Sequence, residues 1–215
     1  MRVLVVAKAP VAGQAKTRLG AQVGPAAAAR LAAASLVDTL RTATAVVGAA
    51  GCHLALTGDL DHAVDNRRLR ALLRGWTVTQ QRGSGLAERI VNAHHDAGLG
   101  PVVQIGMDTP QVTPTLLTAA VRSLDNHDAS LGAAEDGGWW VLARRDPAVV
   151  RPLAGVQMST PSTYADTRAA LLSGGASVTT AAALRDVDTV ADARAVAAVV
   201  PETEFARTWR AVDPT

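Results

Sequence analysis

The hydrophobic pattern of the chain changes repeatedly between short apolar runs and longer segments of helical periodicity. The run at 2–7 is uninterrupted and is bounded by polar, Pro and Gly residues, which predicts a buried parallel strand. The same criteria predict six further strands, at 51–57, 76–80, 101–106, 129–133, 139–143 and 177–180.

Helices are predicted between these strands. Pro25 stands in the first turn of an Ala-rich helix that extends to about Val47, and Thr113 precedes Pro114 as an N-cap. Ser84 begins another helix, with Glu88 close to capping-box spacing. Residues 8–24 are predicted to form one long loop. The remaining predicted helices cover 61–73, 160–172, 190–199 and 204–212.

Strands that alternate with helices predict an α/β fold, a three-layer sandwich with a mostly parallel sheet. The strands 129–133 and 139–143 break the alternation, so we expect a mixed sheet. The chain shows no internal repeat and no interdomain linker, which favours a single domain over 1–215. In open sheets of this kind, ligands bind outside the carboxyl ends of the strands, and the polar motifs fall there.

Composition limits the classes of function. The chain has 215 residues, a hydrophobic content of 48% and a formal net charge of only +2, so a folded core is expected and no nucleic-acid partner. Cys52 stands alone, which excludes an internal disulfide. The N-terminal apolar run is too short for a signal sequence, and no stretch has membrane-spanning length. We therefore expect a soluble, cytoplasmic protein; its oligomeric state stays open, a homodimer included.

The first loop carries the chain's only lysines, Lys8 and Lys16. Gly13 and its small neighbours allow backbone amides to approach a ligand closely. Lys16 and Arg18 can neutralise phosphate charge. The loop is therefore a candidate phosphate site, and the alternative is a solvated surface loop.

A P-loop is the obvious rival for this segment. Its pattern requires Gly at the positions of Pro10 and Ala15, so the motif is absent. We also expect the next helix only at Pro25, too late for a P-loop.

Acidic residues follow three later strands. Asp108 comes directly after the strand 101–106, where a carboxylate can hold Mg²⁺ or Mn²⁺; the alternative is an Asx turn before Pro110. Asp136 lies in a Gly-rich segment that forms either a plain hairpin turn or an acceptor pocket walled by Trp139 or its neighbour. Asp188 stands with Thr189 before a predicted helix, where the pair can form the helix cap.

Other polar segments are less specific. Gly85 and Glu88 lie near a predicted helix N-terminus, which could bind a phosphate or frame a base. The alternative is a glycine-rich loop without a ligand. The hydroxyls of Ser159 and Thr160 contact an acceptor or cap the next helix. His94 and its neighbour His95 have no partner at metal-ligand spacing and are read as core or surface residues.

The run Lys-x-Pro-x-x-Gly-x-x-Lys-Thr-Arg-Leu at 8–19 resembles the start of the glycosyltransferase-A-like proteins often labelled arsenosugar-biosynthesis glycosyltransferases. It is also similar to the 2-phospholactate guanylyltransferases and, more distantly, to the molybdenum-cofactor guanylyltransferases. All belong to the nucleotide-diphospho-sugar transferase superfamily, and four later motifs follow in the same order. The resemblance implies a GT-A-type fold over nearly the whole chain.

The resemblance also implies site roles. Metal ligation falls on Asp108 and Asp188, and catalysis on Lys16, Arg18 and Asp136. Nucleotide binding is implied for Lys8, Ala9, Pro10, Gly13, Thr17, Gly85 and Glu88, and acceptor binding for Gly137, Gly138, Trp139, Ser159 and Thr160. The chain departs from the family pattern where Ala87 replaces Gly, Met158 replaces Trp, Val190 replaces Pro and Ala191 replaces Glu.

Three functions are compatible with this set. The first is a Mg²⁺-dependent nucleotidyltransferase that transfers the nucleotide of a nucleoside triphosphate to a small phosphorylated acceptor and releases pyrophosphate. It would act by positioning and charge neutralisation. The second is a glycosyltransferase that uses a nucleotide-sugar. The third is a non-catalytic nucleotide-binding regulator, which would not need both Asp108 and Asp188.

Overall fold

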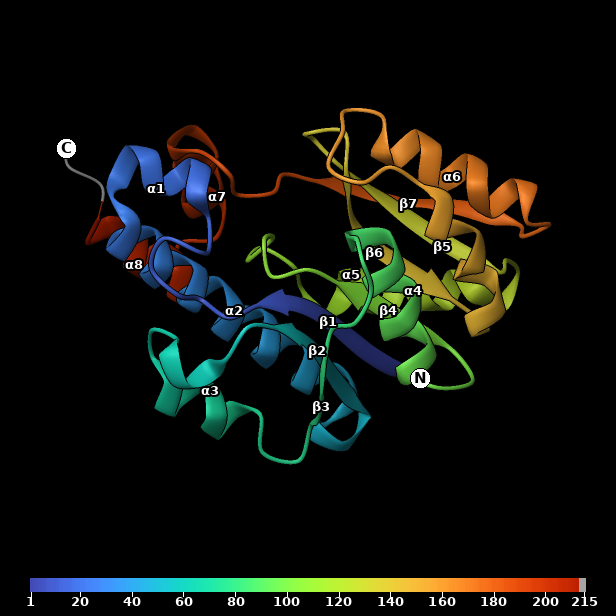
Figure 1. Ribbon diagram of the computed structural model, residues 1–215, viewed down its shortest axis with the longest axis horizontal. Coiled ribbons are helices and arrows are strands. Elements are labelled where there is room, and N and C mark those ends of the chain that lie inside the picture. Colours follow the sequence, from blue (N-terminus) through green and yellow to red (C-terminus); the bar gives the residue numbers. More distant parts are fainter. Residues whose placement is uncertain (213–215) are drawn as a thin grey trace.

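The computed structural model describes residues 1–212 and is built around a seven-stranded sheet of order β3-β2-β1-β4-β6-β5-β7 (Figure 1). Only β6 runs against the other strands, since it pairs antiparallel with both β4 and β5. The predicted mixed, mostly parallel sheet is confirmed. The strands are β1 (Arg2–Lys8), β2 (Cys52–Thr57), β3 (Thr77–Gln80), β4 (Val102–Ile105), β5 (Ala129–Ala134), β6 (Trp139–Arg144) and β7 (Val178–Leu184).

Helices cover both faces of the sheet and make the predicted three layers. Both faces need a cover because successive side chains of a strand point to opposite faces, and those of β1 are apolar on both sides. Val3 and Val5 join a core that includes Leu36 of α2 (Pro25–Val47) and Leu117 of α5 (Pro114–Arg122). Leu4 packs on the opposite face, in a cluster that includes Ala93 of α4 (Leu86–Asp96).

The predicted helices 25–47 and 190–199 are confirmed at their full length, as α2 and α7 (Val190–Val199). The helix predicted at 61–73 is shorter, α3 (Asn66–Leu72), and follows a single 3₁₀ turn. The helix predicted at 160–172 begins later, as α6 (Thr163–Ser173), and the last is α8 (Glu204–Arg210). A 3₁₀ segment at Pro147–Gly155 was not predicted.

The prediction of one loop over 8–24 is wrong in its second half. Helix α1 (Thr17–Val23) begins directly after Lys16, which turns the chain in the left-handed conformation at φ 50°. A seven-residue helix is marginal by itself, and Leu19 stabilises it by being fully buried. The late helix start therefore no longer argues against a P-loop, whereas Pro10 and Ala15 still do.

A second, smaller core lies beyond the end of the sheet, where α1, α7 and α8 gather around the start of α2 (Figure 1). Leu19, Leu31, Phe205 and Trp209 are its largest buried members, and Val187 is buried with them. Asp38 of α2 also links this helix to α8, because its carboxylate accepts hydrogen bonds from the first two backbone amides of α8, at 3.0 and 2.8 Å. This core fixes the loops on either side of Lys16 and Val187. No helix of the described residues is long and apolar enough to cross a membrane.

Arg144 and His94 form a buried polar group beneath the sheet. The Arg144 guanidinium donates to the carbonyl oxygens of His94, Gly98 and Gly100, and its Nε donates to His94 Nδ1 at 3.3 Å. His94 Nε2 lies 2.7 Å from Gln104 Oε1. Burial, with the Arg144 charge second, lowers the pKa of His94 to about 3. The reading of His94 as a core residue is confirmed.

The folding stability of the protein should depend on pH because of His94. The unfolded chain takes up a proton on this imidazole near its ordinary pKa of 6.5 and the folded protein does not, so folding stability falls as the pH drops below that value. We expect about 1.4 kcal/mol of lost unfolding free energy per pH unit from this group. Urea unfolding of His94→Gln over the same range should show a correspondingly shallower decline.

The matched control is His95→Gln, since His95 is 79% exposed on the same helix. Its pH dependence should equal that of the unchanged protein. Equal slopes for all three proteins would contradict the assignment.

Candidate functional site: an acidic cleft closed by a buried lysine

The loops that follow β1, β4 and β7 meet at the carboxyl edge of the sheet, together with the turn between β5 and β6. Backbone bonds join two of them directly, because the amide of Val187 donates to the carbonyl oxygen of Asp108 at 2.9 Å. The Met107 carbonyl oxygen accepts from Ser35 Oγ of α2 at 2.5 Å. The parallel sheet thus brings Lys16, Asp108 and Asp188 to one place.

Lys16 lies between the two predicted metal ligands. Its Nζ is 2.6 Å from Asp108 Oδ1 and 3.1 Å from Asp188 Oδ1, and it also donates to the carbonyl oxygen of Val187. The lysine side chain is only 8% exposed, whereas the carboxylates are 49% and 32% exposed. Burial would lower the pKa of Lys16, but Asp108 and then Asp188 outweigh it and the pKa is raised. The ammonium is therefore charged in the free protein.

The helix-cap alternative for Asp188 is resolved by its neighbours. Thr189 and Asp192 form a reciprocal capping box at the start of α7. The Asp188 carboxylate is directed to the cleft instead, where it pairs with Lys16 and lies 3.2 Å from Arg18 Nη1. Arg18 is 73% exposed and reaches Asp188 from the solvent side.

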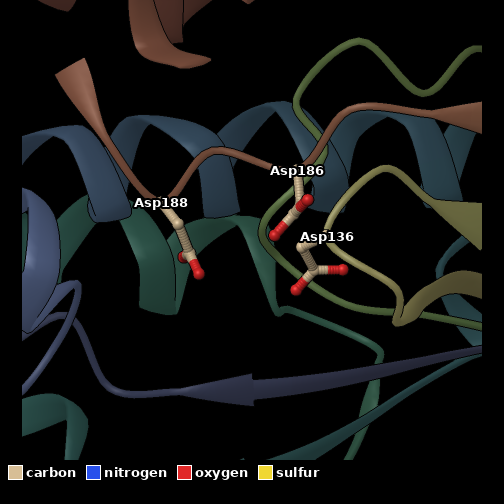
Figure 2. Close-up of side chains that lie close together, drawn as sticks. All are labelled: Asp136, Asp186 and Asp188. Carbon is tan, nitrogen blue, oxygen red and sulfur yellow. The ribbon is translucent and has the colours of Figure 1, made fainter. Parts of the chain in front are cut away.

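Three carboxylates converge beside this lysine. Figure 2 shows Asp186 and Asp188 on the segment after β7 and Asp136 on the β5–β6 turn, with their side chains directed into a common space. One oxygen of each lies within 4.8 Å of the others. Asp186 was not assigned a role from the sequence. Its i, i+2 relation to Asp188 was the available signal, since such residues share one side of an extended segment while Val187 between them is buried in the second core.

The proximity of these acids affects Asp186. Burial raises its pKa to about 6, and the charges of Asp136 and Asp188 add to this shift. Asp136 is held by its own turn, because its Oδ1 accepts from the amide of Gly138 at 2.7 Å. The hairpin turn is therefore present and Asp136 also lies in the cleft, while its role in an acceptor pocket stays a prediction.

The donor set fits a divalent cation. Mg²⁺ and Mn²⁺ prefer hard carboxylate oxygens, and Asp136, Asp186 and Asp188 supply three of them at one point. The arrangement differs from the predicted pair of Asp108 and Asp188, because Lys16 separates those two groups in this structure.

Two adjoining cavities open over this edge of the sheet. The lysine cavity, of about 390 Å³, is lined by Lys8, Lys16, Thr17, Arg18, Gln81 and Arg89 among others. The tryptophan cavity, of about 300 Å³, is lined by Asp136, Asp186, Trp139, Trp140, Ser159 and Thr160 among others. Val6, Leu86, Asp108 and Asp188 line both cavities and form their common border, in which the two aspartates are the charged residues.

Several predicted binding residues lie outside these two cavities. Ala9 and Pro10 are buried, and the Pro10 carbonyl oxygen accepts from Val64. Gly13 contributes a turn with φ 77° and does not line either cavity. Gly85 and Glu88 line a neighbouring hollow that the tryptophan cavity meets at Met158 and Ser159. The Glu88 carboxylate there binds the amide and hydroxyl of Ser84, at 2.8 and 2.9 Å.

Gly137 supports the tryptophan cavity from behind. It has φ 92°, and a Cβ at this position would lie 2.2 Å from the carbonyl oxygen of Pro161. Its own carbonyl oxygen accepts from the amide of Tyr164 at 2.8 Å. Gly137 thus docks the hairpin against the segment that carries Ser159 and Thr160, while Gly138 and Trp139 line the cavity itself.

Comparison with solved structures defines the class of fold. A protein of Desulfovibrio desulfuricans G20, provisionally assigned as a nucleotide-diphospho-sugar transferase, matches with a TM-score of 0.80 and 27% identity over 98% of this chain and 94% of its own. A cytidylyltransferase of Leptospira borgpetersenii matches with a TM-score of 0.61 and 11% identity, over 98% and 92%. CMP:2-keto-3-deoxy-manno-octonic acid synthetase in complex with CTP matches with a TM-score of 0.55 and 14% identity, over 94% of this chain and 99% of its own. The chain has the nucleotide-diphospho-sugar transferase fold.

The chain belongs to the DUF2064 family, described as an uncharacterized protein conserved in bacteria, whose profile matches residues 39–160. No curated protein sequence matches it significantly. The narrower resemblance to arsenosugar-related and guanylyltransferase proteins stays a prediction.

Removing the ammonium tests the arrangement around Lys16. Lys16→Met leaves Asp108 and Asp188 facing each other without a cation, so we expect the metal-free protein to lose about 1–3 kcal/mol of stability, discounted for the exposure of the carboxylates. A divalent ion then meets no competing lysine, so MgCl₂ should raise the thermal midpoint more in this variant than in the unchanged protein.

The control is Lys8→Met, because Lys8 is the chain's other lysine and is exposed at the rim of the lysine cavity. Its melting should be unchanged with and without MgCl₂. An identical response of the two variants would show that Lys16 does not hold the carboxylates together.

Proposed function

We propose that this protein is a divalent-metal-dependent transferase that binds the phosphates of a nucleotide in the lysine cavity and a second substrate in the tryptophan cavity. The observation that carries the proposal is the shared border of the two cavities, whose charged residues are Asp108 and Asp188. Groups bound on either side of this border would meet at the acidic cluster. The transferases with the same fold support the proposal.

Lys8, Lys16, Arg18 and Arg89 give the lysine cavity its cationic character. A nucleotide phosphate entering this cavity would take over the ammonium of Lys16 and the guanidinium of Arg18, which now neutralise Asp188. The released carboxylates would then be available to a cation. A divalent ion supplies charge that offsets the phosphate oxygens in such reactions. Lys16 would couple the two binding events.

Nucleotidyl transfer is the first form of the reaction. An oxygen of the second substrate would attack the α-phosphorus of a nucleoside triphosphate, and pyrophosphate would leave with Lys16 and Arg18 neutralising its charge. Asp136 lines the tryptophan cavity and is the carboxylate proposed to receive the proton of the attacking group. The CTP complex of a protein with the same fold favours this form.

Glycosyl transfer from a nucleotide-sugar is the second form. It is favoured by the half-buried Trp139 ring, which lines the cavity beside Asp136 and could carry a sugar. Release of pyrophosphate from a nucleoside triphosphate would identify the first form, and release of a nucleoside diphosphate from a nucleotide-sugar would identify the second.

A thermal-shift panel tests the proposal directly. Nucleoside triphosphates and nucleotide-sugars are added with and without MgCl₂, and a ligand at about a thousand times its Kd should stabilise the protein by roughly 4 kcal/mol. Asp108→Asn should abolish the Mg²⁺-dependent part, because it removes a charge from the border of both cavities.

Asp125→Asn is the control, since Asp125 is exposed and lines neither cavity. It should respond like the unchanged protein. If no nucleotide shifts the melting transition with Mg²⁺ present, the proposed function is wrong.

A further inference from the structure

The two cavities differ sharply in charge. Cations dominate the lysine cavity, with two lysines and two arginines in its lining. In the described residues, 1–212, the lining of the tryptophan cavity contains no Lys, Arg or His, and it contains four carboxylates, those of Asp108, Asp136, Asp186 and Asp188. The cleft is therefore divided into a cationic half and an anionic half.

Neither Asp136 nor Asp186 forms an ion pair with a cation of the described residues. Lys16 is already shared between Asp108 and Asp188. Arg185 lies next to Asp186 in the sequence, but its guanidinium pairs with Glu135 at 2.6 Å and with Asp192 at 3.5 Å. Even one bound divalent ion would leave the four carboxylates and Lys16 with a net negative charge. A second anion in this cavity would be repelled.

We propose that the second substrate presents an uncharged or cationic, hydroxyl-bearing group to the tryptophan cavity, of the size of a monosaccharide or amino sugar, and that phosphorylated groups are excluded from it. This inference rests on the proposed function, since it names the substrate class of the same site. The sequence led us to expect a phosphorylated, and so negatively charged, acceptor. The charge of the cavity favours an uncharged or positively charged one instead.

The walls of the cavity suit such a ligand. Trp139 Nε1 donates to Thr167 Oγ1 at 3.2 Å, which holds the ring in place, and the ring lines the cavity. A fixed aromatic face packs well against the C–H face of a sugar, and carboxylates accept hydrogen bonds from sugar hydroxyls. Ser159 and Thr160 add hydroxyls on the opposite segment. The volume, about 300 Å³, is at the small end for ligand sites.

Collisional quenching of Trp139 fluorescence measures this preference without a known substrate. Trp139 is half-buried in the cavity wall, whereas Trp76, Trp140 and Trp209 are 8%, 3% and 3% exposed. The quenchers are iodide, neutral acrylamide and caesium, used with saturating MgCl₂ at constant ionic strength. Trp139→Phe supplies the background of the other three indoles.

We expect iodide to quench the Trp139 component several-fold less than acrylamide, and caesium to quench it more than iodide. The double variant Asp136→Asn/Asp186→Asn should remove most of the difference, because it deletes the two carboxylate charges of the cavity that have no ion-pair partner. Asp125→Asn is the matched control and should leave the difference intact. Equal quenching by iodide and caesium in the Mg²⁺-containing protein would overturn the inference.

Protection by small probes provides a second measurement. Glucose and glucosamine should shield Trp139 from acrylamide at least as well as glucose 6-phosphate or inorganic phosphate. Stronger shielding by either phosphate compound would overturn the inference. If no probe shields the ring, the comparison of iodide with caesium decides the question.

The experiment also separates this inference from the proposed function. Quenching of Trp139 requires no nucleotide, whereas the transferase proposal fails when no nucleotide shifts the melting transition. A nucleotide shift combined with free access of iodide would retain the transferase and reject the uncharged substrate. Exclusion of iodide without any nucleotide shift would retain an anionic cavity, but its assignment to a transferase substrate would be lost.

Discussion

The ammonium group of Lys16 connects the parts of the molecule that form the cleft. It bonds Asp108 after β4, Asp188 after β7 and the carbonyl oxygen of Val187, while its own backbone leads from β1 into α1. Without a cation at this point, the carboxylates would repel one another at close range. Lys16 therefore holds the loops together at the same place where a phosphate would compete for its ammonium and a metal ion would compete for its carboxylates.

The fold explains why these groups meet. Strands β1 and β4 are neighbours in the sheet, although their paired residues Val5 and Ile105 are 100 positions apart in the sequence. The loops that follow parallel strands lie at the same edge of a sheet. The second core then holds the segments after β1 and β7 in place, because Leu19 and Val187 are buried in it. The antiparallel strand β6 brings the β5–β6 turn to the same edge and adds Asp136.

Much of the architecture could be predicted from local pattern. The helix from Pro25 to Val47 was found at full length because Pro marks its first turn and its Ala-rich body is a strong helix former. Helix α1 was missed, since Gly20 and the neighbouring glycines suggest a loop and only the burial of Leu19 stabilises a helix there. Asp186 was missed because its role depends on Asp136, fifty residues earlier in the chain.

The sequence by itself determined the mixed α/β sheet, the cationic first loop and the acidic residues at strand ends, because apolar periodicity and residue chemistry are local properties. Only the tertiary structure decided that Lys16 lies between Asp108 and Asp188, that Asp186 joins Asp136, and that the cleft divides into a cationic and an anionic half. The reason is physical: the energy of a charge depends on its distance to other charges and on burial, and both are set by long-range packing.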